Sequence, residues 1–180
     1  MPQRNIELLK KVREEVRRDQ RRKNKRVAMA DWFRFPVLRE KADQTLVITV
    51  DDVPNSCGTT ACVAGWAALL HGDKIVFEIP SQTYIEAYCT PSSTLTYSAI
   101  IARNGVRMPS MQDRGQKLLG LTWQEADFLF TRPDDQALWA LNKFIAGWSL
   151  ERMEGTPGHK RTHHRSYRRP NRTPSFLEDE

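Results

Sequence analysis

A chain of 180 residues with a formal net charge of +6 has the length of one folded domain with polar extensions. It holds no apolar run near the about 18 residues that a membrane span needs, and no signal-peptide core follows Met1. Its three cysteines are an odd and sparse set, unlike those of secreted disulfide scaffolds. We therefore expect a cytoplasmic protein without a membrane partner.

The charge is distributed unevenly along the chain. Residues 1–26 hold 11 Lys/Arg against 4 acids and residues 152–180 hold 7 against 4, whereas residues 27–151 hold 10 against 14. This asymmetry indicates basic extensions that meet nucleic acid, an acidic partner or the body of the protein itself. We predict a basic N-terminal helix in 1–26, a globular α+β domain in 27–151 and a disordered Arg/His-rich tail in 152–180.

The first predicted element is a helix over residues 5–26. The apolar residues of its first half recur at roughly helical spacing and predict a face that docks on the body: Ile6, Leu9, Val12 and Val16. Between residues 17 and 26, seven of ten residues are basic, so the second half is expected to project as a charged, solvated end. The short aromatic segment 30–36 follows as a hydrophobic anchor under the core, and Pro36 ends it.

The middle of the chain predicts strands around one helix. Residues 45–50 and 74–79 are rich in β-branched side chains and predict two strands. The small-residue block Cys57–Leu70 between them predicts a helix that ends at His71-Gly72.

Residues 80–108 leave more than one interpretation open. Residues 84–89 extend the sheet or form a short helix. Residues 97–103 have the pattern of a helix closed by Asn104-Gly105.

From Pro109 onward the pattern is helical. Residues 111–119 predict a helix that ends at Gly120, and Thr122 with Glu125 forms a capping box at the start of the next helix. The buried side of that helix is predicted to hold Ala126, Leu129 and Phe130. A last helix starts after Thr131, with this apolar stripe: Leu138, Leu141, Ile145 and Trp148. The predicted fold class is α+β and mostly helical, with a small two- or three-stranded sheet packed on a central Ala/Gly-rich helix.

The block Cys57–Leu70 supports three interpretations. A cysteine at a helix N-terminus can be a nucleophile with a lowered pKa, but the reaction needs a base, and His71 lies at the far end of the same helix. A zinc site is poorly supported because the spacing of the available ligands is wrong: Cys57, Cys62, His71 and Cys89. Core packing is favoured, with Cys62 as a small hydrophobe and Thr59 or Thr60 as the helix cap. We therefore predict no catalytic residue, no metal site and no cofactor.

Two blocks of the sequence carry a family resemblance. They are Cys57-Gly58-Thr59-Thr60-Ala61-Cys62-Val63-Ala64-Gly65, and Leu118-Leu119-Gly120-Leu121 continued by Glu125-Ala126 and Leu129-Phe130. In this order, over residues 5–150, the chain resembles a group of small uncharacterised proteins of actinobacteria and their bacteriophages, with C-G-T-x-x-C-x-A-G and L-L-G-L-x-x-x-E-A-x-x-L-F blocks.

The resemblance implies an origin in an actinobacterial phage or its host, and hence the host bacterial cytoplasm for a phage-encoded chain. It implies no activity, so no catalytic residue is carried over. The chain departs from the group by a denser basic first helix, a longer 80–108 segment and the Arg/His-rich tail.

The two basic extensions have the composition that non-specific phosphate binding requires, because each neutralised phosphate releases counterions. Tyr167 and the tail histidines suit stacking on single strands or RNA. No zinc-finger, RRM or clear helix-turn-helix motif accompanies them. The residues expected to bind nucleic acid or a partner are Arg17, Arg18, Arg21, Arg22, Lys23, Lys25, Arg26, Arg161, Arg165, Tyr167, Arg168, Arg169 and Arg172.

These sequence patterns are compatible with three hypotheses for the function, which they support to different degrees. The favoured one is a small non-enzymatic accessory protein of phage type that binds a host macromolecule, with a protein as the preferred partner. The alternative is a nucleic-acid-binding protein that uses the basic helix and tail. A remote alternative is a cysteine-dependent hydrolase with Cys57 as its nucleophile.

Overall fold

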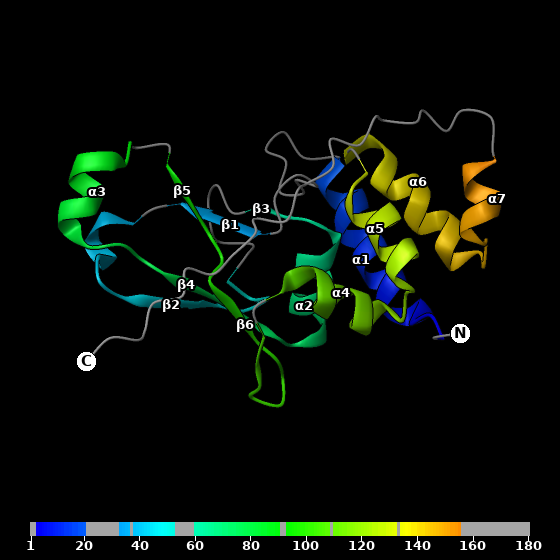
Figure 1. Cartoon of the computed structure of the whole chain (residues 1–180), viewed down its shortest axis with the longest axis horizontal. Coiled ribbons are helices and arrows are strands. Elements are labelled where there is room, and N and C mark those ends of the chain that lie inside the picture. Colours follow the sequence, from blue (N-terminus) through cyan, green and yellow to red (C-terminus); the bar gives the residue numbers. More distant parts are fainter. Residues whose placement is uncertain are drawn as a thin grey trace, which may run out of the picture.

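The protein has an α+β fold that is mostly helical, as predicted from the sequence. A computed structural model describes residues 3–20, 33–36, 38–52, 60–90, 93–108, 110–132 and 134–155. Figure 1 shows two small sheets and one short helix at one end of the molecule and a group of helices at the other. No helix in these ranges is long and apolar enough to cross a membrane.

Seven helices and seven strands are described. The helices are α1 (Ile6–Gln20), α2 (Val63–His71), α3 (Gln82–Tyr88), α4 (Met111–Leu119), α5 (Trp123–Phe130), α6 (Asp134–Ile145) and α7 (Leu150–Glu154), with a 3₁₀ turn η1 (Arg39–Lys41). The strands are β1 (Phe33–Pro36), β2 (Thr45–Ile48), β3 (Thr60–Ala61), β4 (Lys74–Glu78), β5 (Thr94–Thr96), β6 (Ala99–Ile101) and β7 (Arg107–Met108).

The larger sheet is antiparallel, with strand order β2-β4-β6-β7. Its strands β2 and β4 are the two that the β-branched segments predict. A second sheet has the order β3-β1-β5, so the prediction of a single sheet of two or three strands undercounts the strands. The anchor predicted over residues 30–36 contributes strand β1, and the side chains of β1 lie outside the described part of the structure.

The helix predicted over residues 97–103 is wrong, because this segment forms β6 and the start of a hairpin. Ile100 pairs with Ile75 of β4 and with Met108 of β7. The Ala102 N–H donates to the Val106 carbonyl at 2.9 Å, which closes a tight turn. Gly105 has φ +86°, so Asn104-Gly105 acts as a hairpin turn rather than a helix end. The open segment 84–89 is helical through Tyr88, within α3.

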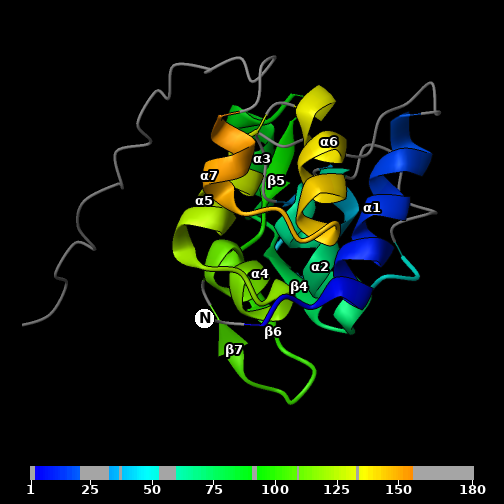
Figure 2. The same ribbon diagram turned by 90° about the vertical axis from the view of Figure 1, so that its right-hand side faces the viewer.

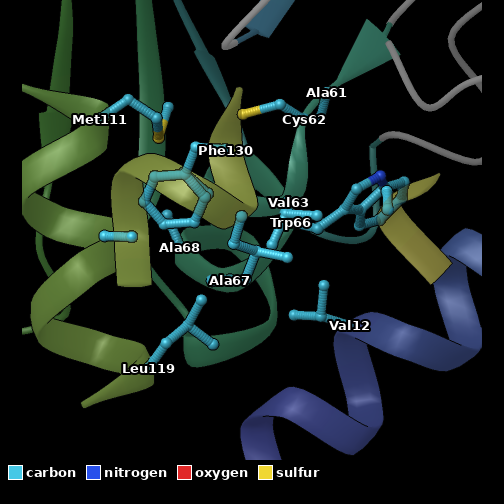
Figure 3. Packing of buried hydrophobic residues seen from close by; sticks show 14 of the residues in the cluster. Val12, Ala61, Cys62, Val63, Trp66, Ala67, Ala68, Met111, Leu119 and Phe130 are labelled. Carbon is cyan, nitrogen blue, oxygen red and sulfur yellow. The ribbon is translucent and has the colours of Figure 1, made fainter. Parts of the chain in front are cut away.

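Helix α2 is the centre of the fold, as its Ala/Gly content predicts. Seven consecutive residues, Val63 to Leu69, are buried. Figure 3 shows Val12 of α1, Met111 and Leu119 of α4 and Phe130 of α5 packed around it. The predicted cap is wrong: Cys62 occupies the N-cap position, while Thr60 belongs to β3. A helix buried on all sides needs small residues, because its neighbours approach it from several directions.

Helix α1 docks on the body by its first turns, as the apolar stripe predicts. Leu9, Val12 and Val16 are buried in the same core as α2 and α6, and Ile6 packs against its edge. The helix is described as far as Gln20, so the rest of the predicted helix lies outside the described residues.

The predicted stripe of the last helix is partly wrong. Leu141 is buried, but the other buried residues of α6 are Ala137, Ala140 and Phe144, while Leu138, Ile145 and Trp148 lie at the edge of the core. Alanine contributes weakly to hydrophobic periodicity, so the sequence pattern does not single out Ala137 and Ala140. The chain then turns at Gly147 into α7, whose Met153 is fully buried. Residues 152–154 of the predicted tail therefore belong to the folded body.

Candidate functional site

Most residues of the predicted binding set lie outside the described structure. Arg17 and Arg18 are the exceptions, and both are exposed near the C-terminal end of α1. The predicted residues between 21 and 26 and between 161 and 172 lie in undescribed segments, as does Cys57.

The basic side chains of α1 are largely paired with carboxylates of the same helix. Arg17 lies 3.6 Å from Glu14, and Arg18 lies 2.7 Å from Glu15. Closer to the N-terminus, Lys10 pairs with Glu7 at 2.8 Å, and Arg13 pairs with Glu14 at 2.9 Å. Exposed pairs of this kind contribute little to stability. They nevertheless neutralise the surface of α1 and reduce its attraction for phosphate.

The described part of the chain as a whole is close to neutral. Its ranges contain 17 Lys/Arg and 18 Asp/Glu, whereas the undescribed segments contain 11 and 4. The positive charge of the protein therefore comes from the segments around residues 21–26 and 160–172. Any long-range attraction for a polyanion originates there and not on the folded body.

Cys62 has the environment of a core residue. Its side chain is fully buried at the N-cap of α2, and Cys89 is half-buried after α3. His71 ends α2 nine residues later, which corresponds to about 13 Å along a helix axis. Cys62 and His71 therefore do not form a nucleophile–base pair. Among the residues that the structure describes, no three His, Cys, Asp or Glu side chains are grouped to hold a metal ion.

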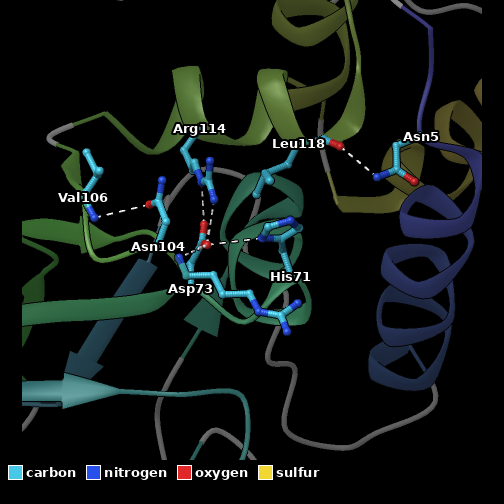
Figure 4. A network of polar contacts seen from close by, with 8 residues as sticks. Asn5, His71, Asp73, Asn104, Val106, Arg114 and Leu118 are labelled. Atoms are coloured by element: carbon cyan, nitrogen blue, oxygen red, sulfur yellow. Dashed lines mark hydrogen bonds and ion pairs between the residues drawn. The ribbon is translucent and has the colours of Figure 1, made fainter.

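The most connected polar group of the body is Asp73, in the turn between α2 and β4 (Figure 4). Its carboxylate is fully buried and accepts two hydrogen bonds from the Arg114 guanidinium of α4, at 2.6 and 2.8 Å. The backbone N–H of Arg103 donates to it at 3.0 Å, and His71 Nδ1 lies 3.3 Å away. Asp73 thus joins α2, the β6–β7 hairpin and α4.

The electrostatics of Asp73 indicate a stable anion. Burial by itself raises the pKa of this carboxyl, but hydrogen bonds from Arg114 and the Arg103 N–H outweigh it, so that the pKa lies below its ordinary value. An ionised carboxylate that makes four contacts with three groups has little capacity left for a ligand or a proton. We interpret the Asp73 cluster as a structural hub that fixes the hairpin to α4.

No local sequence pattern points to this hub, because Asp73 and Arg114 are 41 residues apart. The Gly72-Asp73 pair has the pattern of an ordinary turn after a helix. Only the tertiary structure brings the arginine of α4 to it.

A more accessible candidate site lies on α3. Tyr84 and Tyr88 are 50% and 75% exposed, and their ring centroids are 4.9 Å apart with a 43° angle between the planes. The two residues are four apart and therefore share one helix face. Ile85 between them is fully buried and anchors the helix, and Ser81 caps its N-terminus. We call the surface formed by Tyr84 and Tyr88 the α3 face.

One side-chain contact links α3 to the neighbouring turn η1. The Arg39 side chain of η1 approaches the Cys89 carbonyl at the end of α3 with a separation of 3.5 Å. Figure 1 places α3 at the end of the molecule opposite α6 and α7. The i, i+4 spacing of the tyrosines is visible in the sequence, but their exposure depends on the helical conformation of a segment for which the sequence also allows a strand.

Comparison of the chain with protein-family models, with curated proteins and with solved structures found no match.

Proposed function

We propose that this chain is a small non-enzymatic accessory protein of phage type that binds a host protein through the α3 face. The observation that carries the proposal is the exposure of two neighbouring tyrosines on a helix whose Ile85 side chain is buried. A tyrosine offers a large apolar ring with a polar hydroxyl, and tyrosines are enriched among the residues that dominate binding energy in protein interfaces. A contiguous exposed aromatic pair marks a binding surface more strongly than single exposed apolar residues do.

The charge on α3 favours a protein partner over nucleic acid for this face. The helix Gln82–Tyr88 carries one acidic residue, Glu86, and no Lys or Arg. A surface that stacks nucleobases needs nearby cations for the phosphates between them. The α3 face lacks such cations within its own helix.

Site-specific photo-crosslinking tests this proposal. A photo-reactive phenylalanine analogue replaces Tyr88 in the full chain, which is then expressed in an actinobacterial host and irradiated. We expect one discrete crosslinked host protein, and we expect the Tyr84→Ala substitution to weaken its capture. The control places the same analogue at Val106, which is 55% exposed in the β6–β7 hairpin, away from α3. Equal capture from both positions, or none from position 88, would reject the α3 face as the interface.

A second candidate function is nucleic-acid binding by the basic extensions. Its support is the separation of charge between a neutral body and two strongly basic segments. Arg4, just before α1, hydrogen-bonds the carbonyls of Phe144 and Trp148 near the C-terminal end of α6, so α1 and α6 are antiparallel. Figures 1 and 2 show the C-terminal ends of α1 and α7 both toward the top of the molecule, with α1 and α7 on opposite flanks of the helical group in Figure 2.

A salt titration with labelled duplex DNA, single-stranded DNA and RNA tests this alternative. The full chain is compared with a variant in which the five cations of 21–26 become glutamine and with a variant neutralised at the five arginines of 161–172. Phosphate binding predicts that each variant loses affinity and that the salt dependence becomes shallower. Substitution is preferable to a 27–151 fragment, because that fragment lacks the buried residues of α1 and Met153. No binding by the full chain at about 0.1 M salt would reject this function.

A further inference from the structure

The β6–β7 hairpin ends in a turn that projects from the folded body. Figures 1 and 2 show this turn extending below the helices and the other strands in both views. Val106 in the turn is 55% exposed, and a Cβ atom placed on Gly105 would meet no atom within 4 Å. The turn is therefore a convex projection, and such a shape fits a groove on a partner.

Backbone hydrogen bonds define the conformation of the turn. The Ala102 N–H donates to the Val106 carbonyl at 2.9 Å, and the Gly105 N–H donates to the Ala102 carbonyl at 2.7 Å. The Arg103 N–H donates at 3.0 Å to the buried carboxylate of Asp73, which also binds α4. The tip of the hairpin is thus preorganised, so that binding through it costs little ordering of the backbone.

Exposed cations lie on both faces of the hairpin. Lys74, Ile101 and Arg107 are paired in one line across β4, β6 and β7, so their side chains share the face of the sheet that points away from α2. Arg103 lies on the other side, because a Cβ atom placed on Gly72 at the end of α2 would lie 3.7 Å from the Arg103 Cδ. Residues 102–108 contain no Asp or Glu.

Both arginines of the hairpin are accessible to an anionic partner. In the described part of the chain, the Arg103 side chain is exposed and makes no ion pair. Arg107 lies 3.1 Å from Glu78, and both side chains of this pair are more than 60% exposed. Exposed pairs of this kind are weak, so a phosphate can replace the Glu78 carboxylate as the partner of Arg107.

We propose that the β6–β7 hairpin enters the major groove of duplex DNA. A groove has a row of phosphates along each wall, which matches a ribbon with cations on both faces, whereas a flat acidic protein surface would meet only one face. The major groove of B-form DNA is about 12 Å wide and admits a two-stranded β-ribbon, while the minor groove is about 6 Å wide. This inference rests on the second candidate function, in which the basic extensions supply the long-range attraction for the polyanion.

The geometry also predicts which duplex the hairpin distinguishes. The major groove of A-form RNA is deep and narrow, so the hairpin does not fit into it. In DNA, the apolar side chain of Val106 reaches the groove floor, where thymine presents a methyl group. The hairpin is therefore expected to add affinity for duplex DNA and none for duplex RNA.

Binding titrations with labelled DNA and RNA duplexes of the same sequence test the proposal. We expect Arg103→Gln/Arg107→Gln in the full chain to lower the affinity for DNA at least about tenfold and the salt slope by about 2, because two phosphate contacts are lost. The affinity for RNA should stay unchanged. The control Lys10→Gln/Arg39→Gln removes two exposed charges elsewhere on the body and should bind both duplexes like the unmodified chain.

The hairpin variant is expected to fold, because Arg103 contacts the Asp73 carboxylate through its main-chain N–H and not through its side chain. Circular dichroism checks this. A second measurement leaves both arginines in place: a photo-reactive phenylalanine analogue at Val106 should crosslink to the labelled DNA duplex. The same analogue at Val47, which is 41% exposed in β2, should give no DNA adduct.

The outcomes separate this inference from the function on which it rests. Absence of duplex binding by the full chain would overturn both. Binding that persists unchanged in the hairpin variant, or no adduct from position 106, would overturn the hairpin alone and leave the extensions as the binding element. Equal losses on DNA and RNA would reject insertion into the major groove. Displacement of the DNA by polyglutamate that depends on the two arginines would indicate an acidic protein as the partner instead.

Discussion

Ala64 of α2 and Gly115 of α4 lie at a close contact between the two helices. A Cβ atom placed on Gly115 would lie 2.6 Å from the Ala64 Cβ and 3.2 Å from the Phe130 ring. The two helices approach closely because both residues are small, and the close approach lets α4 carry Arg114 to Asp73. The contact thus connects the packing of the core with its polar hub.

Gly115→Ala is expected to destabilise the protein by about 1–3 kcal/mol, because α4 must move away from Ala64. In an unconstrained helix the same change is stabilising by about 0.5–1 kcal/mol. Urea unfolding of the two proteins measures the difference. The matched control is Gly155→Ala, where the added Cβ meets only the Glu151 carbonyl at an ordinary 3.5 Å. Similar effects of the two substitutions would contradict the proposed cause.

Removal of the Asp73 carboxylate is expected to destabilise the fold strongly. Asp73→Ala leaves the Arg114 guanidinium, with only 15% of its side chain exposed, without its partner. Loss of one member of a buried ion pair typically costs about 3–5 kcal/mol. The double variant Asp73→Ala/Arg114→Met should recover part of this loss, because it also removes the unpaired charge. Equilibrium unfolding of the two single variants and the double variant checks the coupling; strictly additive losses would show that the pair does not act as a unit.

Stability is expected to fall in acid through Asp73 and Glu125. Burial raises the pKa of Glu125, but hydrogen bonds from Arg4 and the Thr122 N–H outweigh burial, so this pKa is also lowered in the folded state. A carboxyl with a lowered folded-state pKa stabilises the protein above its unfolded pKa of about 4, and this contribution disappears as the pH falls through the folded-state value.

Unfolding midpoints measured between about pH 2 and pH 7 test this expectation, since the loss should begin below about pH 4. Asp73→Asn should be less stable at neutral pH and should have a flatter profile in acid. Identical slopes in the two proteins would show that Asp73 does not carry the effect.

Arg4 connects the segment before α1 to α5 and to the C-terminal end of α6. Its guanidinium pairs with Glu125 and donates to the carbonyls of Phe144 and Trp148. Lysine keeps the charge but offers no planar fork of donors, so Arg4→Lys should recover only part of the loss caused by Arg4→Ala. Thermal unfolding compares the variants with the full chain, and Lys10→Ala on the exposed surface of α1 serves as the control. Full recovery by lysine would mean that charge alone holds Arg4 in place.

The stability of the protein is expected to depend on whether the side chain at position 62 is apolar, and only weakly on whether it carries a thiol. Cys62→Ala should cost about 1 kcal/mol, because the site already accommodates a small residue, whereas Cys62→Asp buries an unpaired charge and should unfold the protein. Circular dichroism and urea unfolding distinguish the two outcomes. The Cys62 thiol should react with a thiol reagent only after unfolding, and rapid reaction in the native state would contradict its burial.

Local signals in the sequence predict much of the secondary structure. Gly120 ends α4 with φ +63°, and Thr122 with Glu125 forms the expected capping box at the start of α5. These features depend on residues three or four positions apart, so a short stretch of sequence contains all of their partners. The apolar stripe of α1 likewise identifies its docking face, because each buried residue recurs after about one turn.

Other features depend on partners far along the chain. Residues 97–103 have helical character locally, yet Ile100 becomes part of a strand because β4 offers it a paired neighbour. The backbone of Gln3 also lies directly over Gly120. A Cβ atom added to Gly120 would clash with the Gln3 carbonyl oxygen, so only glycine fits at this position. The sequence predicts that a glycine ends the helix, but it contains no signal that the N-terminal segment crosses over it.

Composition and short-range periodicity encode the fold class, the central small-residue helix and the location of the positive charge, because all three depend on residues close together in the chain. Packing of the whole chain, in contrast, leaves Tyr84 and Tyr88 exposed on one face and makes β2 the last strand of its sheet among the described residues. These properties depend on which surfaces remain uncovered after packing. Whether an element is buried depends on the elements that pack against it, and most of these lie tens of residues away in the chain.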